Sequence, residues 1–414
     1  YAVKPDNVSF VIENTDIAET DGAGNIYAKA RGKTVLTASC GAASASMDIL
    51  VDDAINSIDI NSQSDILQVS NEYDMQIIAN TEFGRKIPID NADISVDVNA
   101  KVLKNGKVKP TLCGAVNVTA KSGGLTAVKK FEVVDKLINT VALNADKTWA
   151  DMGGSVKLDI IVKDEQGNPM NTDGMKAVYS HGGEIISSEN NTAEYIADSI
   201  GINRLDVSVE WKGMTFSASK YIAVRPSKNV VPDGWTFTNI GQQAEGFASL
   251  KPDGSIEVVS QSRDIWGKSD DFTFIYKEID MNNVNELEVS CGINPYVYAS
   301  SINHAAGVMI RNSLESDAYN ASIRYSPRGV LRGVWRNPET PECYYIAGTD
   351  TTLPEKVKLT KKGNEIIYSQ TINGEWFDVG RKTLPPSDKV YVGICVTSGG
   401  LQEINVFDLQ VNTK

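Results

Sequence analysis

The sequence predicts an all-β protein made of several β-sandwich domains in tandem. Its 414 residues are too many for one ordinary core, since domains usually hold about 100–150 residues. Turns rich in glycine and asparagine recur about every ten residues, which favours many short strands over long helices. Apolar and polar residues alternate along several segments, which is typical of strands with one buried face.

Three internal repeats indicate the domain organisation. They begin at Gly32, Gly114 and Gly201, and each reads as a two-stranded hairpin whose second strand leaves the domain. The spacings of 82 and 87 residues match the length of one immunoglobulin-like sandwich. Alternating apolar residues predict strands in two separate segments. In the third repeat one strand face carries Leu205, Val207, Val209 and Trp211, and in an earlier segment one strand face carries Val156, Leu158, Ile160 and Val162.

The repeats predict four domains. We expect three small modules at 1–53, 54–135 and 136–226 and a larger domain at 232–414. Residues 225–234 are predicted to form a linker, because they contain prolines and small polar residues and show no periodic pattern of apolar residues. The first module is short, so either it is a truncated sandwich or the chain begins inside it.

Two regions resemble known bacterial families. GNIYAKARGKTVLTAS (24–39) resembles group 2 immunoglobulin-like domains, and VKLDIIVKDEQGNPM (156–170) is similar to invasin-type domains. GWTFTNIG (234–241), DIWGKSDDFTFIY (264–276), AAGVMIRNSL (305–314), VKLTKKGNEIIYSQTINGEWFDVG (357–380) and VYVGICVTSGG (390–400) follow the order of a concanavalin-A-like (laminin-G-like) domain of secreted bacterial carbohydrate-active enzymes. These resemblances imply tandem immunoglobulin-like β-sandwiches plus a larger C-terminal jelly-roll, often a carbohydrate-binding domain.

Composition excludes some classes of partner. The net charge of −13 would repel nucleic acid, and no run reaches the ~18 apolar residues of a membrane helix. The five cysteines stand singly, without metal-ligand spacing, so we expect buried free thiols. The chain starts at Tyr1 rather than Met, and we expect a piece of a longer protein, secreted or on the cell surface.

Arginines crowd one segment of the last domain. Pro327, Gly329 and Gly333 argue against a helix there, so we place Arg332 and Arg336 on one face of a strand and Trp335 on the other. Arginine suits an acidic sugar such as a uronate, because a guanidinium binds a carboxylate in a bidentate manner. The alternative is a solvated, salt-bridged face. The cluster comprises Arg311, Arg324, Arg328, Arg332 and Arg336.

Aromatic residues accompany the arginines, and 19 of the 31 Phe, Trp and Tyr residues lie from Val230 onward. Trp335, Tyr344 and Tyr345 flank the loop 336–343, where they could stack on a sugar ring or pack the loop onto the sandwich. Trp235 and Trp266 are expected in the core, and Trp376 could be either. The predicted ligand-binding residues are Arg311, Arg332, Trp335, Arg336, Tyr344 and Tyr345.

Evidence for a cofactor or for catalysis is weak. No cofactor is expected, with structural calcium as an alternative at Asp264, Asp270 and Asp271 or at Asp280, Asn282 and Asn283. The two histidines, His181 and His304, are far apart, and no catalytic motif is present.

The sequence therefore predicts a non-catalytic accessory region of a secreted carbohydrate-active enzyme. Immunoglobulin-like spacers would present a sandwich that binds a polysaccharide, with a catalytic domain upstream in the same polypeptide. Binding would be lost on Trp335→Ala or Tyr345→Ala. The alternatives are a cell-surface adhesin or stalk and, less favoured, a catalytic sandwich that degrades glycans.

Overall fold

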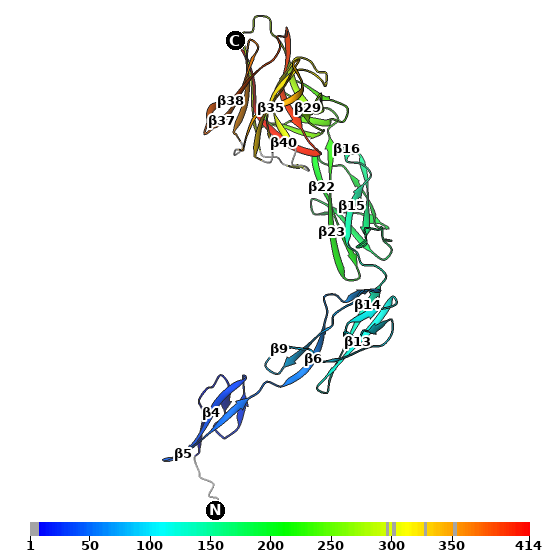
Figure 1. The fold of residues 1–414 in the computed structure, drawn as a ribbon, viewed down its shortest axis with the longest axis vertical. Helices are drawn as coiled ribbons and strands as arrows, with labels where there is room; N and C mark the ends of the chain where they lie inside the picture. Colours follow the sequence, from blue (N-terminus) through cyan, green and yellow to red (C-terminus); the bar gives the residue numbers. More distant parts are fainter. Residues whose placement is uncertain (1–7, 295–297, 300–303, 327–328, 351–353) are drawn as a thin grey trace, which may run out of the picture. The chain divides into compact units, whose positions relative to one another are not determined.

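The structure is a computed structural model that describes residues 8–294, 298–299, 304–326, 329–350 and 354–414 (Figure 1). Every regular element within these ranges is a β-strand, which confirms the prediction of an all-β fold. None of the described segments is a helix that is long and apolar enough to cross a membrane. The chain divides into two compact units, residues 1–140 with 162–170 and residues 141–161 with 171–414.

The first unit begins with a small group of strands. β1 (Ser9–Ile12), β4 (Gly32–Cys40) and β5 (Ala43–Val51) form a three-stranded sheet, and β2 (Ala18–Thr20) pairs with β3 (Ile26–Ala28). From Val8 onward, the buried apolar residues of its core are Ile12, Ala18, Leu36 and Val51, a small set that agrees with the short length of this part of the chain.

Two sheets with a shared core follow in the first unit. One sheet has the order β10 (Asp93–Val96), β13 (Gly114–Ser122), β14 (Leu125–Val134) and β7 (Ile66–Gln68). The other has the order β6 (Ile55–Asn61), β8 (Gln76–Thr81) and β9 (Lys86–Ile89), and β11 (Ala100–Val102) pairs with β12 (Val108–Pro110). Ile60, Ile77, Val118 and Phe131 come from both sheets and lie in one core, as in a β-sandwich.

A further pair of sheets precedes the large sandwich. One has the order β15 (Thr140–Ala145), β17 (Ser155–Lys163), β21 (Thr192–Ile196) and β20 (Ser188–Glu189). The other has the order β16 (Trp149–Asp151), β23 (Met214–Arg225), β22 (Gly201–Trp211), β18 (Lys176–His181) and β19 (Glu184–Ile186). The predicted alternation on β22 is confirmed, because Leu205, Val207, Val209 and Trp211 are all buried.

The three predicted hairpins are present in the structure. Gly32, Gly114 and Gly201 each begin a long strand, and these strands pair antiparallel with the next strand as β4–β5, β13–β14 and β22–β23. The division into domains at 1–53, 54–135, 136–226 and 232–414 stays a prediction.

The C-terminal part contains two large antiparallel sheets. The first has the order β24 (Thr236–Ile240), β29 (Phe272–Asp280), β39 (Lys389–Thr397), β32 (Ala305–Arg311), β33 (Asn320–Ser326), β34 (Val330–Asn337) and β35 (Thr340–Asp350). The second has the order β25 (Glu245–Leu250), β26 (Ile256–Gln261), β40 (Leu401–Thr413), β30 (Glu286–Ile293), β36 (Lys356–Lys362), β37 (Glu365–Ile372) and β38 (Glu375–Thr383), with β31 (Tyr298–Ala299) paired to β40. One core contains buried residues from both sheets, such as Val308 and Ile323 from the first and Val289 and Leu359 from the second.

The predicted linker is held by hydrogen bonds rather than being a free segment. Val230 accepts a hydrogen bond from Leu250 N–H and donates its own N–H to Ala248, so it adds a parallel bridge beside β25. Asn229 Oδ1 accepts a hydrogen bond from Ala248 N–H. These hydrogen bonds pair part of the predicted linker with the edge of β25, and the linker at 225–234 stays a prediction.

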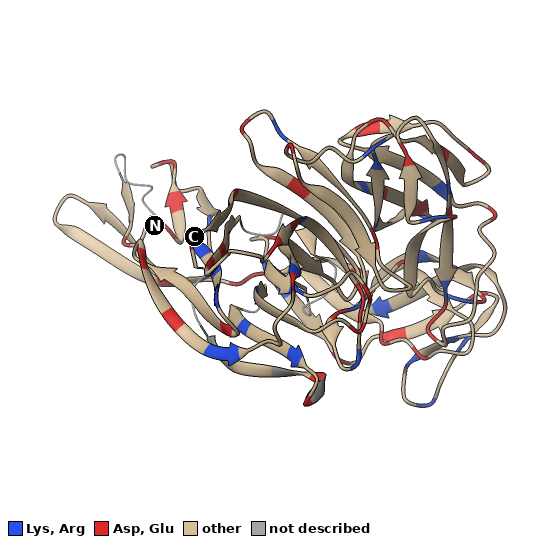
Figure 2. Ribbon diagram, turned by 90° about the horizontal axis from the view of Figure 1, so that it is seen from above, with Lys and Arg blue, Asp and Glu red and all other residues tan. Residues whose placement is uncertain are grey.

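Charges of both signs and unpaired cysteines are distributed along the chain. Acidic and basic residues are interspersed along the strands and loops (Figure 2). All five cysteines are free; Cys291, Cys343 and Cys395 are buried as predicted, whereas Cys40 is half-buried and Cys113 is exposed. The prediction of burial was wrong for these two, because Cys40 ends a strand and Cys113 lies in a turn.

Candidate functional site

The loop 262–271 covers part of the outer face of the seven-stranded sheet, the face turned away from the eight-stranded sheet. It contains a short hairpin, β27 (Ile265–Trp266) and β28 (Ser269–Asp270). Ile265 is fully buried and packs in a second core with Phe272, Met309 and Val334. Because neighbouring residues of a strand point to opposite sides, Trp266 is left facing solvent.

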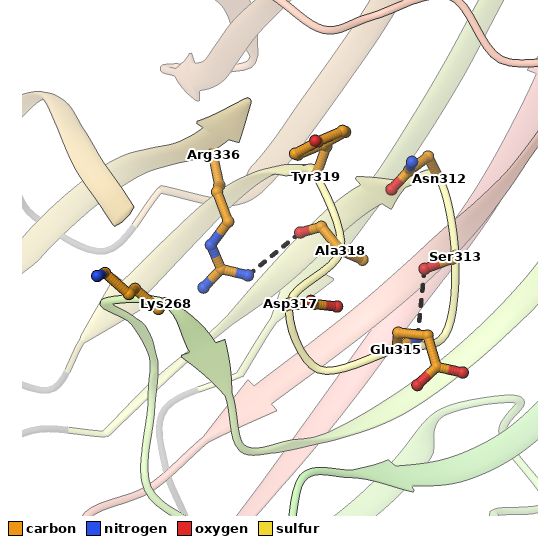
Figure 3. Close-up of a pocket in the computed structure, with 8 residues that line it drawn as sticks. All are labelled: Lys268, Asn312, Ser313, Glu315, Asp317, Ala318, Tyr319 and Arg336. Carbon is orange, nitrogen blue, oxygen red and sulfur yellow. Dashed lines mark hydrogen bonds between the residues drawn. The ribbon is translucent and has the colours of Figure 1, made fainter. Parts of the chain in front are cut away.

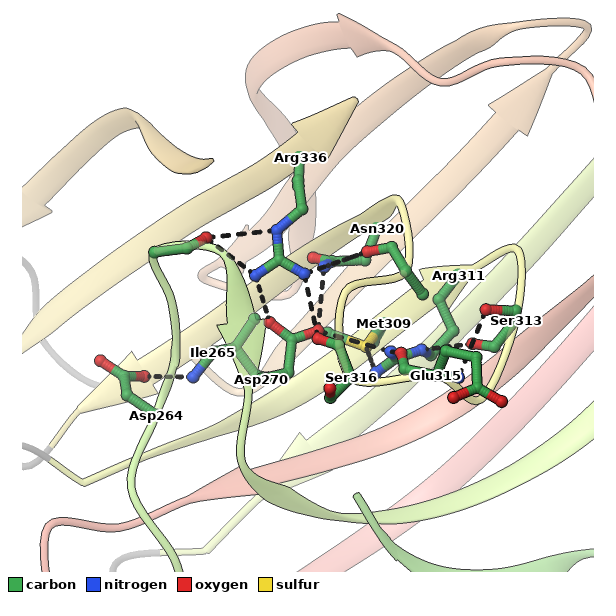
Figure 4. A network of polar contacts seen from close by, with 12 residues as sticks. Asp264, Ile265, Asp270, Met309, Arg311, Ser313, Glu315, Ser316, Asn320 and Arg336 are labelled. Carbon is green, nitrogen blue, oxygen red and sulfur yellow. Dashed lines mark hydrogen bonds and ion pairs between the residues drawn. The ribbon is translucent and has the colours of Figure 1, made fainter. Parts of the chain in front are cut away.

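Two arginines from the sheet hold one end of this loop (Figure 4). The Arg336 guanidinium lies 2.6 Å from Asp270 Oδ1 and donates hydrogen bonds to Gly267 O at 2.9 and 3.3 Å. The Arg311 guanidinium lies 3.4 Å from Asp270 Oδ2 and donates to the carbonyls of Ser313 and Glu315. Asn320 Nδ2 also donates to Asp270, at 3.2 Å.

A third arginine holds the other end. Arg324 Nη1 lies 2.7 Å from Asp264 Oδ1, and Nη2 donates to Ile265 O at 3.2 Å. The N–H of Cys343 in β35 donates to Gly267 O at 3.0 Å. The residues on both sides of Trp266 are therefore fixed by the sheet beneath them.

Burial dominates the electrostatics of this network. It raises the pKa of the Asp270 carboxyl above its ordinary value, although the Arg311 and Arg336 guanidiniums act in the opposite direction. Burial likewise lowers the pKa of Arg311 to about 10. It raises the pKa of Cys343 to about 11 and that of Cys395 to about 12, so both thiols stay protonated and unreactive at neutral pH.

The structure separates the predicted arginines into two groups. Arg311 is 0 % exposed and Arg336 is 1 % exposed, and their hydrogen bonds go to the protein, so they fit a structural role rather than the predicted ligand contact. Arg332 is partly exposed, and its guanidinium carbon lies 5.2 Å from the centre of the Tyr345 ring. Arg328 lies outside the described residues.

An exposed aromatic pair lies beside Arg332. Trp266 is 43 % exposed and Tyr345 is 50 % exposed, and their ring centres are 4.8 Å apart at an angle of 42°. The prediction that Trp266 lies in the core was wrong, because the short hairpin places Ile265 inward and Trp266 outward. The signal in the sequence was the Gly267–Lys268 turn in DIWGKSD, which makes a two-residue hairpin.

The other predicted aromatic residues lie differently. Trp335 points to the opposite face from Arg332 and Arg336, as predicted, and packs against the main core. It therefore fits a packing role. Tyr344 pairs with Trp335 in the β34–β35 ladder, and its side chain lies outside the described part of the structure.

Two hollows border the loop. One, of about 320 Å³, is lined by Trp266 together with Gln242, Gln243, Arg263, Asp264, Ser269, Asp270 and Asp271. The other, of about 400 Å³, is lined by Lys268, residues of the β32–β33 connection and Arg336 (Figure 3). The first hollow combines an aromatic ring with amide, hydroxyl and charged groups, which is the chemistry that a sugar requires.

The calcium alternative does not fit the acids of this loop. Asp264 and Asp270 face guanidiniums, and Asp271 accepts backbone N–H bonds from Gln243 and Arg263. Calcium needs six to eight oxygen ligands, whereas here these oxygens already accept hydrogen bonds from protein groups. Within the described residues, no group of three or more His, Cys, Asp or Glu side chains could hold a metal. The alternative at Asp280, Asn282 and Asn283, which relies on amide oxygens, stays a prediction.

The histidines offer no catalytic arrangement. His304 is 0 % exposed, and burial lowers its pKa to about 4, so it is neutral at ordinary pH and out of reach of a substrate. His181 ends β18, against Tyr195 and 3.6 Å from Asp198.

Comparisons with known proteins show no family. No family model matches the chain, and no curated protein matches it. Among solved structures, it is similar to a functionally unknown Saccharomyces cerevisiae protein (14 % identity, 44 % of this chain and 97 % of that one, TM-score 0.34). It is also similar to domains 4–9 of the surface layer protein SbsC (9 %, 98 % and 89 %, 0.22) and to a structure from a study of carbohydrate-binding modules of the β-sandwich superfamily (13 %, 66 % and 98 %, 0.21). Scores this low carry no argument about function, and the family resemblances drawn from the sequence stay predictions.

Proposed function

We propose that the C-terminal sandwich binds a polysaccharide on the surface formed by Trp266, Tyr345 and Arg332. The observation that carries this proposal is an exposed aromatic pair that the protein holds in place. Exposing neighbouring aromatic side chains to water costs free energy, and such exposed apolar patches often mark a binding site. Here three buried arginines fix the loop that carries Trp266, so little freedom is lost when a ligand binds.

In this proposal the chain is a non-catalytic accessory region. Residues 1–225 act as spacers, and a catalytic domain elsewhere in the same polypeptide degrades the polysaccharide. A weak sugar site is useful in such a protein, because tethering raises the effective concentration of the enzyme at the polymer.

Affinity gel electrophoresis with a broad panel of plant and host polysaccharides tests the proposal. We expect retention by at least one glycan, and we expect Trp266→Ala and Tyr345→Ala to weaken it by about tenfold or more, as for central aromatic contacts. Trp266→Ala is a better test than Trp335→Ala, the variant that the sequence suggests, because Trp335 packs against the core.

Trp376→Ala is the matched control. Trp376 is 40 % exposed but lies on β38 of the other sheet, with Lys358 Nζ 4.5 Å from its ring centre. Its loss should leave retention unchanged. Retention that depends on Trp376 and not on Trp266 would move the site to that sheet. Failure of the chain to bind any glycan would favour the adhesin or stalk, and release of sugar by this chain alone would show a catalytic sandwich.

A further inference from the structure

Four arginines of the seven-stranded sheet lie on its outer face, next to the aspartates of the loop 262–271. Arg311, Arg324 and Arg336 are buried against the loop; Arg311 and Arg336 both pair with Asp270, and Arg324 pairs with Asp264. Arg332 lies directly opposite Arg324 in the β33–β34 ladder and is the fourth arginine. Within the described residues, Arg332 is therefore the one of these four sheet arginines that has no carboxylate partner.

A second arginine, Arg263, lies beside Trp266. The Arg263 side chain is exposed and lines the same hollow as Trp266, while its backbone N–H is bonded to Asp271. Within the described ranges, neither Arg263 nor Arg332 has an ion-pair partner for its guanidinium. Lys268, in the turn after Trp266, lies 3.9 Å from Glu342, so these two charges offset each other.

The stacking of Arg332 leaves its hydrogen-bond donors available. A guanidinium that lies over an aromatic ring uses its flat face, and its N–H groups point outward in the plane. That edge matches the two oxygens of a carboxylate or a sulfate. An uncharged sugar would leave both unpaired guanidiniums without an anionic partner.

We propose that the ligand is an acidic polysaccharide whose sugars carry carboxylate or sulfate groups, bound by Arg332 and Arg263 while a ring stacks on Trp266 and Tyr345. This rests on the proposed function and names its substrate class. The chain's net charge of −13 repels a polyanion at long range, as it would repel nucleic acid. Charges more than about 8 Å away are largely screened at physiological ionic strength, so the adjacent guanidiniums dominate.

Matched pairs of polymers test the substrate class. Polygalacturonate is compared with its methyl ester, and dextran sulfate with dextran, in affinity gels at low and at physiological salt. We expect retention by at least one acidic member and weaker retention by its neutral counterpart. The first pair reports a carboxylate and the second a sulfate.

Variants of single arginines test which side chains bind the acidic groups of the polymer. Arg332→Gln and Arg263→Gln should each weaken retention by the acidic polymer about tenfold, as expected for loss of a charged hydrogen bond. Arg381→Gln changes the net charge equally but lies on β38 of the other sheet, paired with Glu365 and Asp378, and should have no effect. An equal loss in Arg381→Gln would show that net charge alone controls retention and would overturn the inference.

The failures of the two proposals are distinguishable. Equal retention by both members of a pair, lost in Trp266→Ala but not in Arg332→Gln, would overturn the acidic class and leave the sugar-binding proposal standing. No retention by any polymer, acidic or neutral, would overturn both.

Discussion

At the scale of single residues, Asp270 is the centre of the buried network that holds the loop 262–271. It is 0 % exposed and faces the buried guanidiniums of Arg311 and Arg336. A buried carboxylate between two arginines is costly to form, but it is costlier to break, because removing one partner leaves uncompensated charge in a medium of low polarity.

Asp270→Asn should therefore lower the free energy of unfolding by about 3–5 kcal/mol. Urea denaturation followed by tryptophan fluorescence measures this change. Asp378→Asn is the control, since it breaks an exposed pair with Arg381 and should cost less than about 1 kcal/mol. Equal effects of the two variants would show that the buried network contributes no more than a surface ion pair.

At the scale of elements, glycines allow the central strands of the seven-stranded sheet to pack closely. A Cβ at Gly393 in β39 would lie 1.9 Å from Ile275 O of β29, and a Cβ at Gly307 in β32 would lie 1.9 Å from Ile323 O of β33. No side chain fits there without moving the neighbouring strand. In the strand ladders Gly307 is paired with Arg324 and Gly393 with Met309, two residues of the outer face that the loop 262–271 covers.

Gly393→Ala should accordingly destabilise the sandwich by about 2 kcal/mol or more, since overpacking shifts backbone. The midpoint of urea denaturation reports the effect. An unchanged midpoint would show that the strands separate at little cost.

At the scale of the whole molecule, the second compact unit contains a junction between the strands at 149–225 and the large sandwich. Trp149 contacts Phe247 edge-on, and its indole N–H donates to Gln261 Oε1 at 2.8 Å. The Ile202 N–H donates to Glu403 Oε2 at 2.8 Å, and Arg225 pairs with Glu245 at 3.0 Å. Burial raises the pKa of Glu403, and the Ile202 N–H acts against this shift.

Trp149→Ala should uncouple these two parts of the unit. Loss of a buried tryptophan removes about 3–5 kcal/mol of packing, so a single unfolding transition should become two. Tryptophan fluorescence is a selective probe, because all six tryptophans lie at or after position 149, outside the first unit. Trp376→Ala removes an exposed tryptophan and should keep one transition. A single transition in Trp149→Ala would show that other contacts suffice to hold the junction.

Local patterns in the sequence determined the fold class and the strand hairpins. The alternation in β22 and the hairpin patterns that begin at Gly32, Gly114 and Gly201 act over short stretches of chain, so they can be recognised without knowing how the sheets are ordered. The same logic placed Arg332 and Arg336 on one face of β34 and Trp335 on the other.

Only the tertiary structure decided what each of these side chains does. Arg332 and Arg336 share a face, yet one is partly exposed and the other is buried, because the loop 262–271 covers Arg336 from about 65 positions earlier in the chain. That loop also places Trp266, which the sequence predicts in the core, on the surface beside Tyr345. The sequence determined which way each side chain points from its strand, whereas contacts between distant segments decided which faces meet water.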